Sequence, residues 1–250
     1  MAKKTDAKPE VKEVVKYTEN AFVAKLTQGR VSAYDDILDL AENMEGVAPR
    51  LPQITIVHAG QMFKFSDSDN KADTITGVIL DTNRANAWWA GAYTGEGARP
   101  DCSSLDGIAP EGGEMMQAEA CAECPQNEYG TSIGDDGEAG PGKACKNMRR
   151  VHILTAESKI PYRLTLPPSG LGAWDQYVTS LTGKSLPYQA VVTTIALIEK
   201  RNKKGIAFSE PVFLAEGDPI PPAQVKAVII PERNNWLSAM RGQDITSEEA

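Results

Sequence analysis

Four cysteines are the residues of this 250-residue chain whose type and spacing best fit a chemical role. They are Cys102, Cys121, Cys124 and Cys145, so one C-x-x-C pair lies between two single cysteines. A C-x-x-C turn presents two thiolates to one metal ion, and the outer cysteines complete a tetrahedral shell of four sulfur ligands. The pattern predicts one structural Zn²⁺. An iron–sulfur cluster and free or redox-active thiols are the alternatives.

The segment around the cysteines gives a metal ion a structural purpose. Residues 91–142 are rich in Gly, Asp, Glu and Pro and show neither helical nor strand periodicity. Such a long stretch without an apolar core does not order itself, because the lost chain entropy is not offset. Zinc bound by cysteines contributes on the order of 10–16 kcal/mol, which offsets that cost. We therefore expect a metal-binding insertion at residues 91–150, with His58 and His152 as strand residues rather than ligands.

Charge is distributed unevenly along the chain, whose formal net charge is -8. Residues 141–204 carry eleven Lys and Arg against three Asp and Glu, whereas the segments before and after them are acidic. A basic segment within an acidic chain indicates an anionic partner for that segment. The alternative is that these cations scatter over the fold, or pair with loop acids such as Asp135, Asp136 and Glu138.

Cations and aromatic rings near the last cysteine form the predicted nucleic-acid surface. Lys and Arg bind phosphates with release of counterions, and aromatic rings stack on unpaired bases. A backbone fixed by metal at Cys145 would hold the adjacent cations, and further cations lie at the tip of a predicted hairpin. The predicted contacts are Lys143, Lys146, Arg149, Arg150, Tyr162, Arg163, Lys200, Arg201, Lys203 and Lys204, with Trp88 and Trp89 as stacking rings ahead of Tyr93, Tyr129 and Tyr188.

Three strings resemble a family of bacteriophage-encoded proteins of poorly defined function. They are P-D-C-S-S-L-D-G at residues 100–107, C-A-E-C-P-Q-N at 121–127 and G-K-A-C-K-N-M-R-R at 142–150. The likeness continues into residues 166–169 and covers roughly residues 75–200. This resemblance implies a phage or prophage setting in the bacterial cytoplasm. It also implies sequence-independent binding of single-stranded DNA during replication or recombination.

Hydrophobic periodicity predicts a β-rich α+β fold, with an OB-type barrel, a zinc-bound loop insertion and a few peripheral helices. Strands are predicted at residues 53–58, 62–65, 75–80, 86–90, 151–154, 162–166, 188–199 and 206–214, and helices at 32–44 and 169–183. The predicted organisation is a mobile tail at 1–30, one domain at 31–235 and an acidic tail at 236–250. Similar acidic tails of single-strand-binding proteins recruit replication partners, and we expect the same here.

Other functions have weaker sequence support. The phosphate loop G-x-x-x-x-G-K-[ST], the G-x-S-x-G elbow and the H-E-x-x-H motif are absent from the sequence. Asp101 and Asp106 flank a cysteine and leave a metal-dependent nuclease as one alternative. A phage protein that binds and modifies a host or replication complex is another. No apolar run approaches the roughly 18 residues of a membrane span, and the N-terminus lacks a signal-peptide core, so we expect a cytoplasmic protein.

Overall fold

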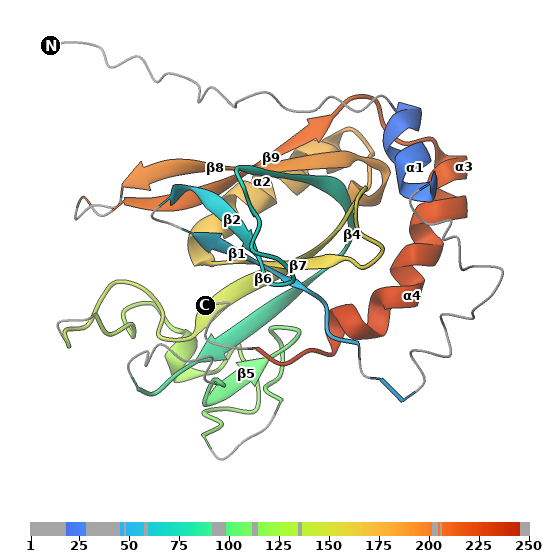
Figure 1. Cartoon of the computed structure of the whole chain (residues 1–250). Coiled ribbons are helices and arrows are strands. Elements are labelled where there is room, and N and C mark those ends of the chain that lie inside the picture. The colour runs from blue at the N-terminus through green and yellow to red at the C-terminus, as the bar shows by residue number, and fades with distance from the viewer. Residues whose placement is uncertain are drawn as a thin grey trace, which may run out of the picture.

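One strongly curved sheet dominates the computed structural model, which describes residues 19–28, 46–47, 49–57, 60–91, 99–111, 115–134, 137–201, 205 and 207–245. The strands among these residues are β1 (Gln53–Val57), β2 (Met62–Phe65), β3 (Lys71–Ala72), β4 (Thr74–Trp88), β5 (Cys102–Ser104), β6 (Lys146–Thr155), β7 (Tyr162–Leu166), β8 (Val192–Arg201) and β9 (Ala207–Glu216). Their order is β3-β2-β1-β7-β6-β4-β8-β9, with β5 paired to β4 (Figure 1). The predicted β-rich α+β class with few helices is confirmed.

The strand pairings do not confirm the predicted OB-type barrel. An OB fold closes five strands into a barrel. Here the pairings run from β3 to β9, and within the described part of the chain no pairing joins those two edges. The β1–β7 pair is parallel, whereas its neighbours in the sheet are antiparallel. The sheet is therefore an open, curled one rather than a closed barrel.

Helices cover both faces of this sheet and create two apolar layers. The helices are α1 (Glu19–Gln28), α2 (Leu171–Gly183), α3 (Pro222–Gln224) and α4 (Ile230–Arg241), and a π-helical turn (Val225–Ile229) joins the last two. On one face, Trp174, Tyr177 and Leu181 of α2 pack against Ile195 and Phe213 of the sheet. The predicted helix at 169–183 is thus confirmed, and Trp174 is a core residue. Burying one such side chain contributes about 1.5–3 kcal/mol.

The opposite face is covered by α1 and α4, which sequence periodicity did not predict. Phe22 and Leu26 of α1 are almost completely buried, in one cluster with Ile229 and Met240 from the C-terminal helical segment. Figure 1 shows α1 beside α3 and α4 at the right edge of the sheet. The predicted boundary of a mobile tail at residue 30 is therefore wrong for residues 19–28. The helix predicted at 32–44 lies outside the described residues, as does His58.

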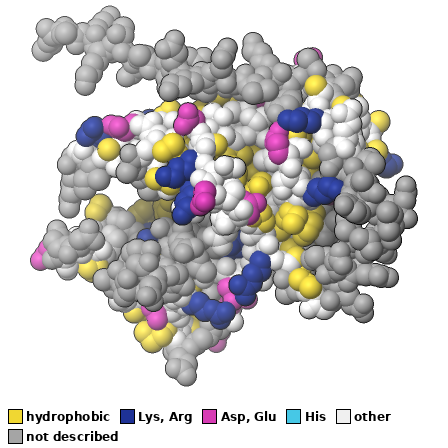
Figure 2. Space-filling model, in the orientation of Figure 1, with side chains coloured by type: hydrophobic (Ala, Val, Ile, Leu, Met, Phe, Trp, Pro, Cys, Tyr) yellow, Lys and Arg dark blue, Asp and Glu magenta, His cyan; other side chains and the backbone are white. Residues whose placement is uncertain are grey.

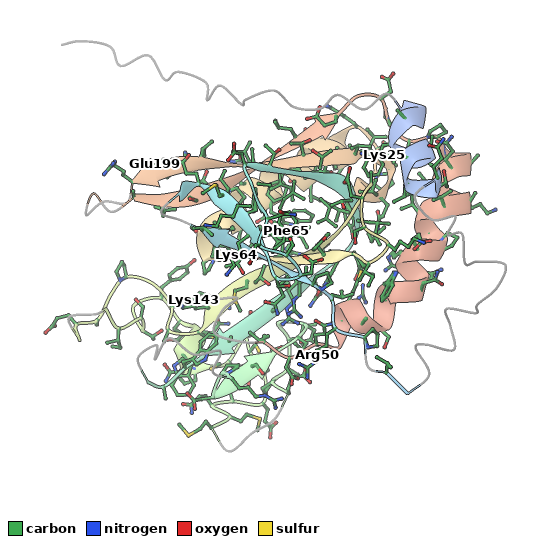
Figure 3. The ribbon with its side chains drawn as sticks, in the orientation of Figure 1. Lys25, Arg50, Lys64, Phe65, Lys143 and Glu199 are labelled. Atoms are coloured by element: carbon green, nitrogen blue, oxygen red, sulfur yellow. The ribbon has the colours of Figure 1, made fainter. Side chains whose placement is uncertain are left out.

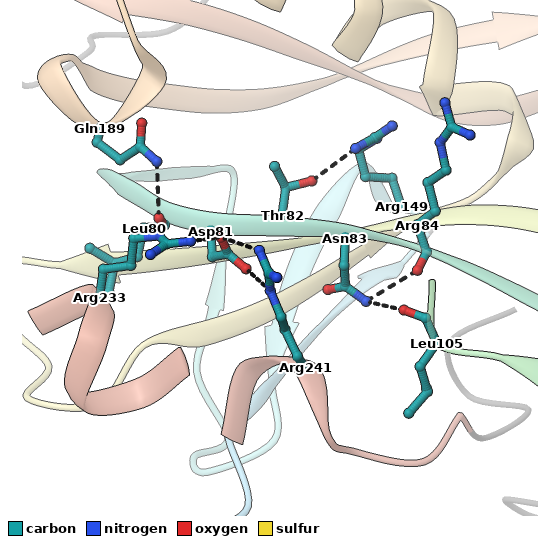
Figure 4. A network of polar contacts seen from close by, with 10 residues as sticks. All are labelled: Leu80, Asp81, Thr82, Asn83, Arg84, Leu105, Arg149, Gln189, Arg233 and Arg241. Atoms are coloured by element: carbon teal, nitrogen blue, oxygen red, sulfur yellow. Dashed lines mark hydrogen bonds and ion pairs between the residues drawn. The ribbon is translucent and has the colours of Figure 1, made fainter. Parts of the chain in front are cut away.

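Strand β4 is one long element where two short strands were predicted. Its polar stretch, which begins at Asp81, has the composition of a turn, yet it continues the strand past a bulge between Ile79 and Asp81. The Asp81 carboxylate is buried and accepts hydrogen bonds from Arg233 (2.9 Å) and Arg241 (2.8 and 3.1 Å), both on α4 (Figure 4). We call this group the Asp81 clasp. Burial favours a raised pKa for Asp81, but the hydrogen bonds and charges of Arg241 and Arg233 outweigh it and lower the pKa.

The end of the chain is also seated on the sheet. Arg150 is completely buried and donates hydrogen bonds to the backbone carbonyls of Gln243 (2.5 Å) and Asp244 (2.9 Å). Arg163, also buried, donates to the Gln243 side chain at 2.7 Å, and Ile245 is buried beside them. A buried guanidinium cannot contact nucleic acid, so the predictions for Arg150 and Arg163 are wrong. The predicted tail at 236–250 is likewise wrong up to Ile245, and residues 246–250 lie outside the described ranges.

Candidate metal centre and nucleic-acid surface

The structure gathers the four cysteines around one small pocket. All four line it, together with Trp88, and its free volume of about 20 Å³ holds roughly one water-sized sphere. The members come from separate elements, since Cys102 begins β5, Cys121 and Cys124 precede the 3-10 turn Pro125–Asn127, and Cys145 precedes β6. All four are free of disulfide bonds. The fold therefore places the four thiols around one pocket, and the shared metal site stays a prediction.

Backbone hydrogen bonds fix the geometry of the C-x-x-C turn. The Cys121 amide donates to the Ile108 carbonyl at 2.8 Å, and the Asn127 amide donates to the Cys124 carbonyl at 2.9 Å. The Asn127 side chain donates to the Cys121 carbonyl at 2.7 Å, which closes the turn a second time. The Cys145 amide donates to the Gln126 carbonyl at 2.7 Å. The turn and the last cysteine are thus tied directly to each other.

The thiols are close enough to influence one another's ionisation. Burial, together with the charges of Cys124, Cys121 and Cys102, raises the pKa of Cys145 to about 12. Burial also raises the pKa of Cys102, against a backbone hydrogen bond from Gln117 that lowers it. Among the described residues, no group of three or more His, Cys, Asp or Glu side chains is arranged so that it could hold a metal ion. The thiols are gathered, and the chemistry of their sulfur donors fits a tetrahedral metal site.

His152 lies away from this cluster, as expected for a strand residue. It is buried in β6, between Asp81 of β4 and Arg163 of β7 in the strand register. Burial, reinforced by the charge of Arg163, lowers the pKa of His152 to about 3, so the ring is neutral at physiological pH. It does not line the cysteine pocket.

The predicted cluster of cations around Cys145 is divided by the strand geometry. In β6, Arg149 lies opposite Arg84 and Lys146 lies opposite Ala87. Because side chains alternate along a strand, residues three apart point to opposite faces. Lys146 therefore lies on the face away from Arg149, with its ammonium group 5.9 Å from the Trp89 ring centre. The prediction that these cations form one continuous patch is wrong.

Lys143 and Tyr129 form a cation–aromatic pair on the loop beside the cysteines. The Lys143 ammonium group lies 5.0 Å from the centre of the Tyr129 ring, and the tyrosine is 82% exposed. Lys143 also donates a hydrogen bond to the Asn127 side chain at 3.1 Å. Since Asn127 closes the C-x-x-C turn, the pair is connected to the cysteines through a single residue. Sequence reasoning ranked Tyr129 below other rings, because nothing in its local sequence indicates exposure.

Arg84 and Arg149 lie on the same face of the β4–β6 pair, the face on which Arg149 contacts Trp174 of α2. The Arg149 guanidinium carbon is 5.8 Å from the Trp174 ring centre, and its Nη1 donates to the Thr82 hydroxyl at 3.2 Å. Figure 2 shows the surface hollowed at the left, between the end of the β8–β9 hairpin and the loop that carries Lys143, which Figure 3 labels. Arg84 was missed in the sequence because it stands in an acidic segment.

The β8–β9 hairpin carries partly neutralised cations at its end. Lys200 lies 3.7 Å from Glu210, and Arg201 lies 2.9 Å from Glu199. Such exposed ion pairs contribute about 0–1 kcal/mol each, so both cations can exchange their partners for phosphates. Lys203 and Lys204 lie outside the described residues.

The aromatic rings ranked first by sequence have structural roles. Trp88 lines the cysteine pocket, and Trp89 packs against the small apolar cluster that includes Met148. Tyr162 stacks edge-on against Phe65 at 5.2 Å and donates its hydroxyl hydrogen to Asp67 at 2.9 Å. All three rings are only half-buried, yet none is presented as openly as the ring of Tyr129. Tyr93 lies outside the described residues, and Tyr188 lies against Trp174.

The two aspartates considered for a nuclease shape turns. Asp101 accepts a hydrogen bond from the Ala90 amide at 2.7 Å. Asp106 accepts from the Ile108 amide at 2.7 Å and the Ser104 hydroxyl at 2.9 Å, and the Ile108 bond is the main cause that lowers the pKa of Asp106. Their oxygens are engaged in shaping the chain around β5, which favours the turn interpretation.

Comparisons with known proteins do not identify a family or a function for this chain. Neither protein-family models, curated proteins nor solved structures give a match to this chain. Within the described ranges, none of the helices combines the length and the apolar character that crossing a bilayer requires.

Proposed function

We propose that this protein binds single-stranded DNA without sequence preference, in a phage or prophage setting. The observation that carries the proposal is the exposed Tyr129 ring beside Lys143, on a loop connected to the cysteine cluster. An exposed ring next to a cation matches what unpaired nucleic acid offers, since the base stacks and the phosphate pairs with the ammonium group. The strand would lie in the hollow of Figure 2, between this loop and the end of the β8–β9 hairpin.

We further propose that Cys102, Cys121, Cys124 and Cys145 hold one structural Zn²⁺. A bound zinc ion supplies cross-linking of four chain positions, and no chemistry on the DNA is required of it. The residues of this chain then transmit that rigidity, because Asn127 bonds both to the C-x-x-C turn and to Lys143. Three amides, those of Gly130, Thr131 and Ser132, donate to the Gly142 carbonyl and keep the loop folded back on itself.

The open sheet still allows the mode of binding expected of OB-type barrels. Those folds bind a strand across a curved sheet with loops at its borders. We propose that the face of β4 and β6 that carries Arg84 and Arg149 serves as the floor here. The loop with Lys143 would form one border, and Lys200 and Arg201 on the hairpin the other.

Salt-dependent binding of a fluorescently labelled oligo-dT tests the function. The dissociation constant, followed by anisotropy, is expected to rise with salt, with a slope of about 0.7 per phosphate contact in logarithmic units. Tyr129→Ala is expected to weaken binding by about 5- to 150-fold, which corresponds to the usual contribution of one stacked base. Because Tyr129 is exposed, this change leaves the fold intact.

Charge reversal provides the matched comparison. Lys143→Glu is expected to weaken oligo-dT binding at least tenfold, whereas Lys226→Glu, at an exposed position among the C-terminal helices, is expected to change it less than twofold. The proposal is wrong if the wild-type protein shows no salt-dependent binding of oligo-dT, either with or without supplied zinc.

A protein-binding role is the second candidate, and exposed apolar side chains favour it. Ile108 and Ile133 are 66% and 67% exposed, and Met115 and Met116 are also exposed, all within the cysteine-containing segment. Exposed apolar groups mark docking surfaces when they lie together in one patch, and we propose that these side chains do so when a partner binds. Under this alternative, a phage protein that binds and modifies a host or replication complex, Ile108→Ser with Ile133→Ser would abolish partner binding. The same changes would leave oligo-dT binding by the first candidate intact.

A further inference from the structure

Arg84 and Arg149 form a pair of like charges in a place where sheets normally avoid one. They lie directly opposite each other on β4 and β6, so their side chains share a face and start about 5 Å apart. Figure 4 shows both side chains on one side of β4, away from the side occupied by Asp81. Like charges in this cross-strand position are destabilising. The pair is therefore not explained by sheet stability.

Carboxylates of the described residues leave this charge unpaired. No ion pair joins Arg84 or Arg149 to an acidic side chain in the described part of the chain. Asp175 influences Arg149 only through its charge, without a hydrogen bond. The Asp81 clasp differs in this respect. Its buried carboxylate, on the same strand as Arg84, pairs with both Arg233 and Arg241 of α4. Among the described residues, a carboxylate faces one arginine pair and none faces the other.

The Arg149 side chain is held in place, but its Nε lacks an acceptor within the described part of the chain. Its guanidinium faces the Trp174 ring and donates one hydrogen bond to Thr82, whereas its Nε is buried and donates to no partner. A buried donor without an acceptor is unfavourable, and a bound anion would supply the acceptor. The backbone of Gly107 packs closely against Arg84, since a Cβ on Gly107 would lie only 3.0 Å from the Arg84 Cβ. That close approach, together with a φ of +72°, accounts for the glycine.

We propose that Arg84 and Arg149 together bind one phosphate group. Guanidinium groups present planar forks of N–H donors that match phosphate oxygens, and two forks from one face surround a single tetrahedral anion. The phosphate comes either from a phosphodiester within a DNA strand or from a 5′-terminal phosphate. The first source rests on the proposed function, whereas binding of the anion itself does not.

Inorganic phosphate is the probe that tests the site itself. Thermal unfolding of the full chain is followed in rising phosphate, with sodium chloride at matched ionic strength as the reference. The wild-type protein is expected to show saturable stabilisation by phosphate beyond that of chloride. Arg84→Gln, at an exposed position, is expected to weaken the apparent phosphate affinity at least tenfold, and Lys71→Gln, also exposed, to leave it within twofold. Equal phosphate stabilisation of wild type and Arg84→Gln would overturn the inference.

Oligonucleotides then distinguish the source of the phosphate. If inorganic phosphate competes with unphosphorylated oligo-dT for the wild-type protein but not for Arg84→Gln, the site binds an internal phosphodiester. A tenfold preference for 5′-phosphorylated over 5′-hydroxyl oligo-dT, lost in Arg84→Gln, supports a terminal phosphate. If oligo-dT binds but Arg84→Gln changes neither phosphate nor DNA affinity, the site fails and the proposed function stands. Phosphate binding that depends on Arg84, without any DNA binding, supports the site and refutes the function.

Discussion

Replacing Asp81 with asparagine removes the charge at the centre of the Asp81 clasp while keeping the side-chain shape. The carboxylate accepts three hydrogen bonds, one from Arg233 and two from Arg241. Its side chain is 2% exposed, whereas those of Arg233 and Arg241 are 24% and 52% exposed. In Asp81→Asn, an NH₂ group replaces one of the two carboxylate oxygens. Its N–H donors then face the N–H donors of a guanidinium group, so at least one contact becomes repulsive.

The size of the effect follows from these exposures. Removing one partner of a buried ion pair costs about 3–5 kcal/mol, and exposed pairs are worth about 0–1 kcal/mol. Because Arg241 is half exposed, its share is discounted, and we expect Asp81→Asn to destabilise the protein by about 2–4 kcal/mol. For a chain of this length each kcal/mol corresponds to about 2–4 °C, so Tm should fall by roughly 4–16 °C.

Urea unfolding and calorimetry measure this change, with Asp218→Asn at an exposed position as the control. The dependence on pH gives a second test. Since the folded pKa of Asp81 is lowered, its stabilisation is present above the unfolded pKa of about 3.9 and is lost as pH falls through the folded pKa. Asp81→Asn should therefore flatten the acid limb of the stability curve. Loss of less than 0.5 kcal/mol, with an unchanged acid limb, would refute the reasoning.

Two further substitutions test other parts of the fold. Arg150→Met leaves the carbonyls of Gln243 and Asp244 without donors, so we expect trypsin to cleave after Arg241 at least fivefold faster; unchanged cleavage would show that the arginine does not hold the chain end. Gly77→Ala would place a Cβ 2.5 Å from the Leu154 carbonyl oxygen in the middle of the sheet, and it should cost about 1–3 kcal/mol in urea unfolding; a neutral result would mean that the strands separate there without strain.

Sequence patterns located the elements whose own residues determine them. The strand predicted at 162–166 coincides with β7, and the strand at 62–65 with β2, because apolar and polar residues alternate along β7 and along the Phe-Lys-Phe stretch of β2. The predicted strand at 53–58 matches β1 over Gln53–Val57, and residue 58 lies outside the described residues. The predicted strand at 188–199 begins instead as a 3-10 turn, after which β8 starts at Val192. Boundaries shift where the pattern is locally ambiguous.

Elements that depend on distant residues were missed. The polar stretch of β4 reads as a turn, and it remains extended because α4, about 150 residues later, supplies the two arginines that bind Asp81. Helix α4 has a weak apolar stripe, and only Pro231 near its start and the spacing of Trp236, Leu237 and Met240 indicate it. Its polar residues suggested a solvated tail instead.

The candidate site shows the same division between local and distant information. Cysteine spacing alone predicted that four thiols gather, and the fold places them around one pocket. Strand alternation, which the sequence did not reveal because β6 was predicted too short, separates Lys146 from Arg149 and buries Arg150. Arg84 becomes part of the surface only through its cross-strand register with Arg149.

Elemental analysis of protein purified without added metal tests the central claim most directly, since the proposed function rests on a loop held by zinc at the four cysteines. We expect about one zinc ion per chain, with zinc lost in parallel when Cys121 and Cys124 are both replaced by serine. Folded wild-type protein that binds oligo-dT with less than about a tenth of a metal ion per chain would contradict the account.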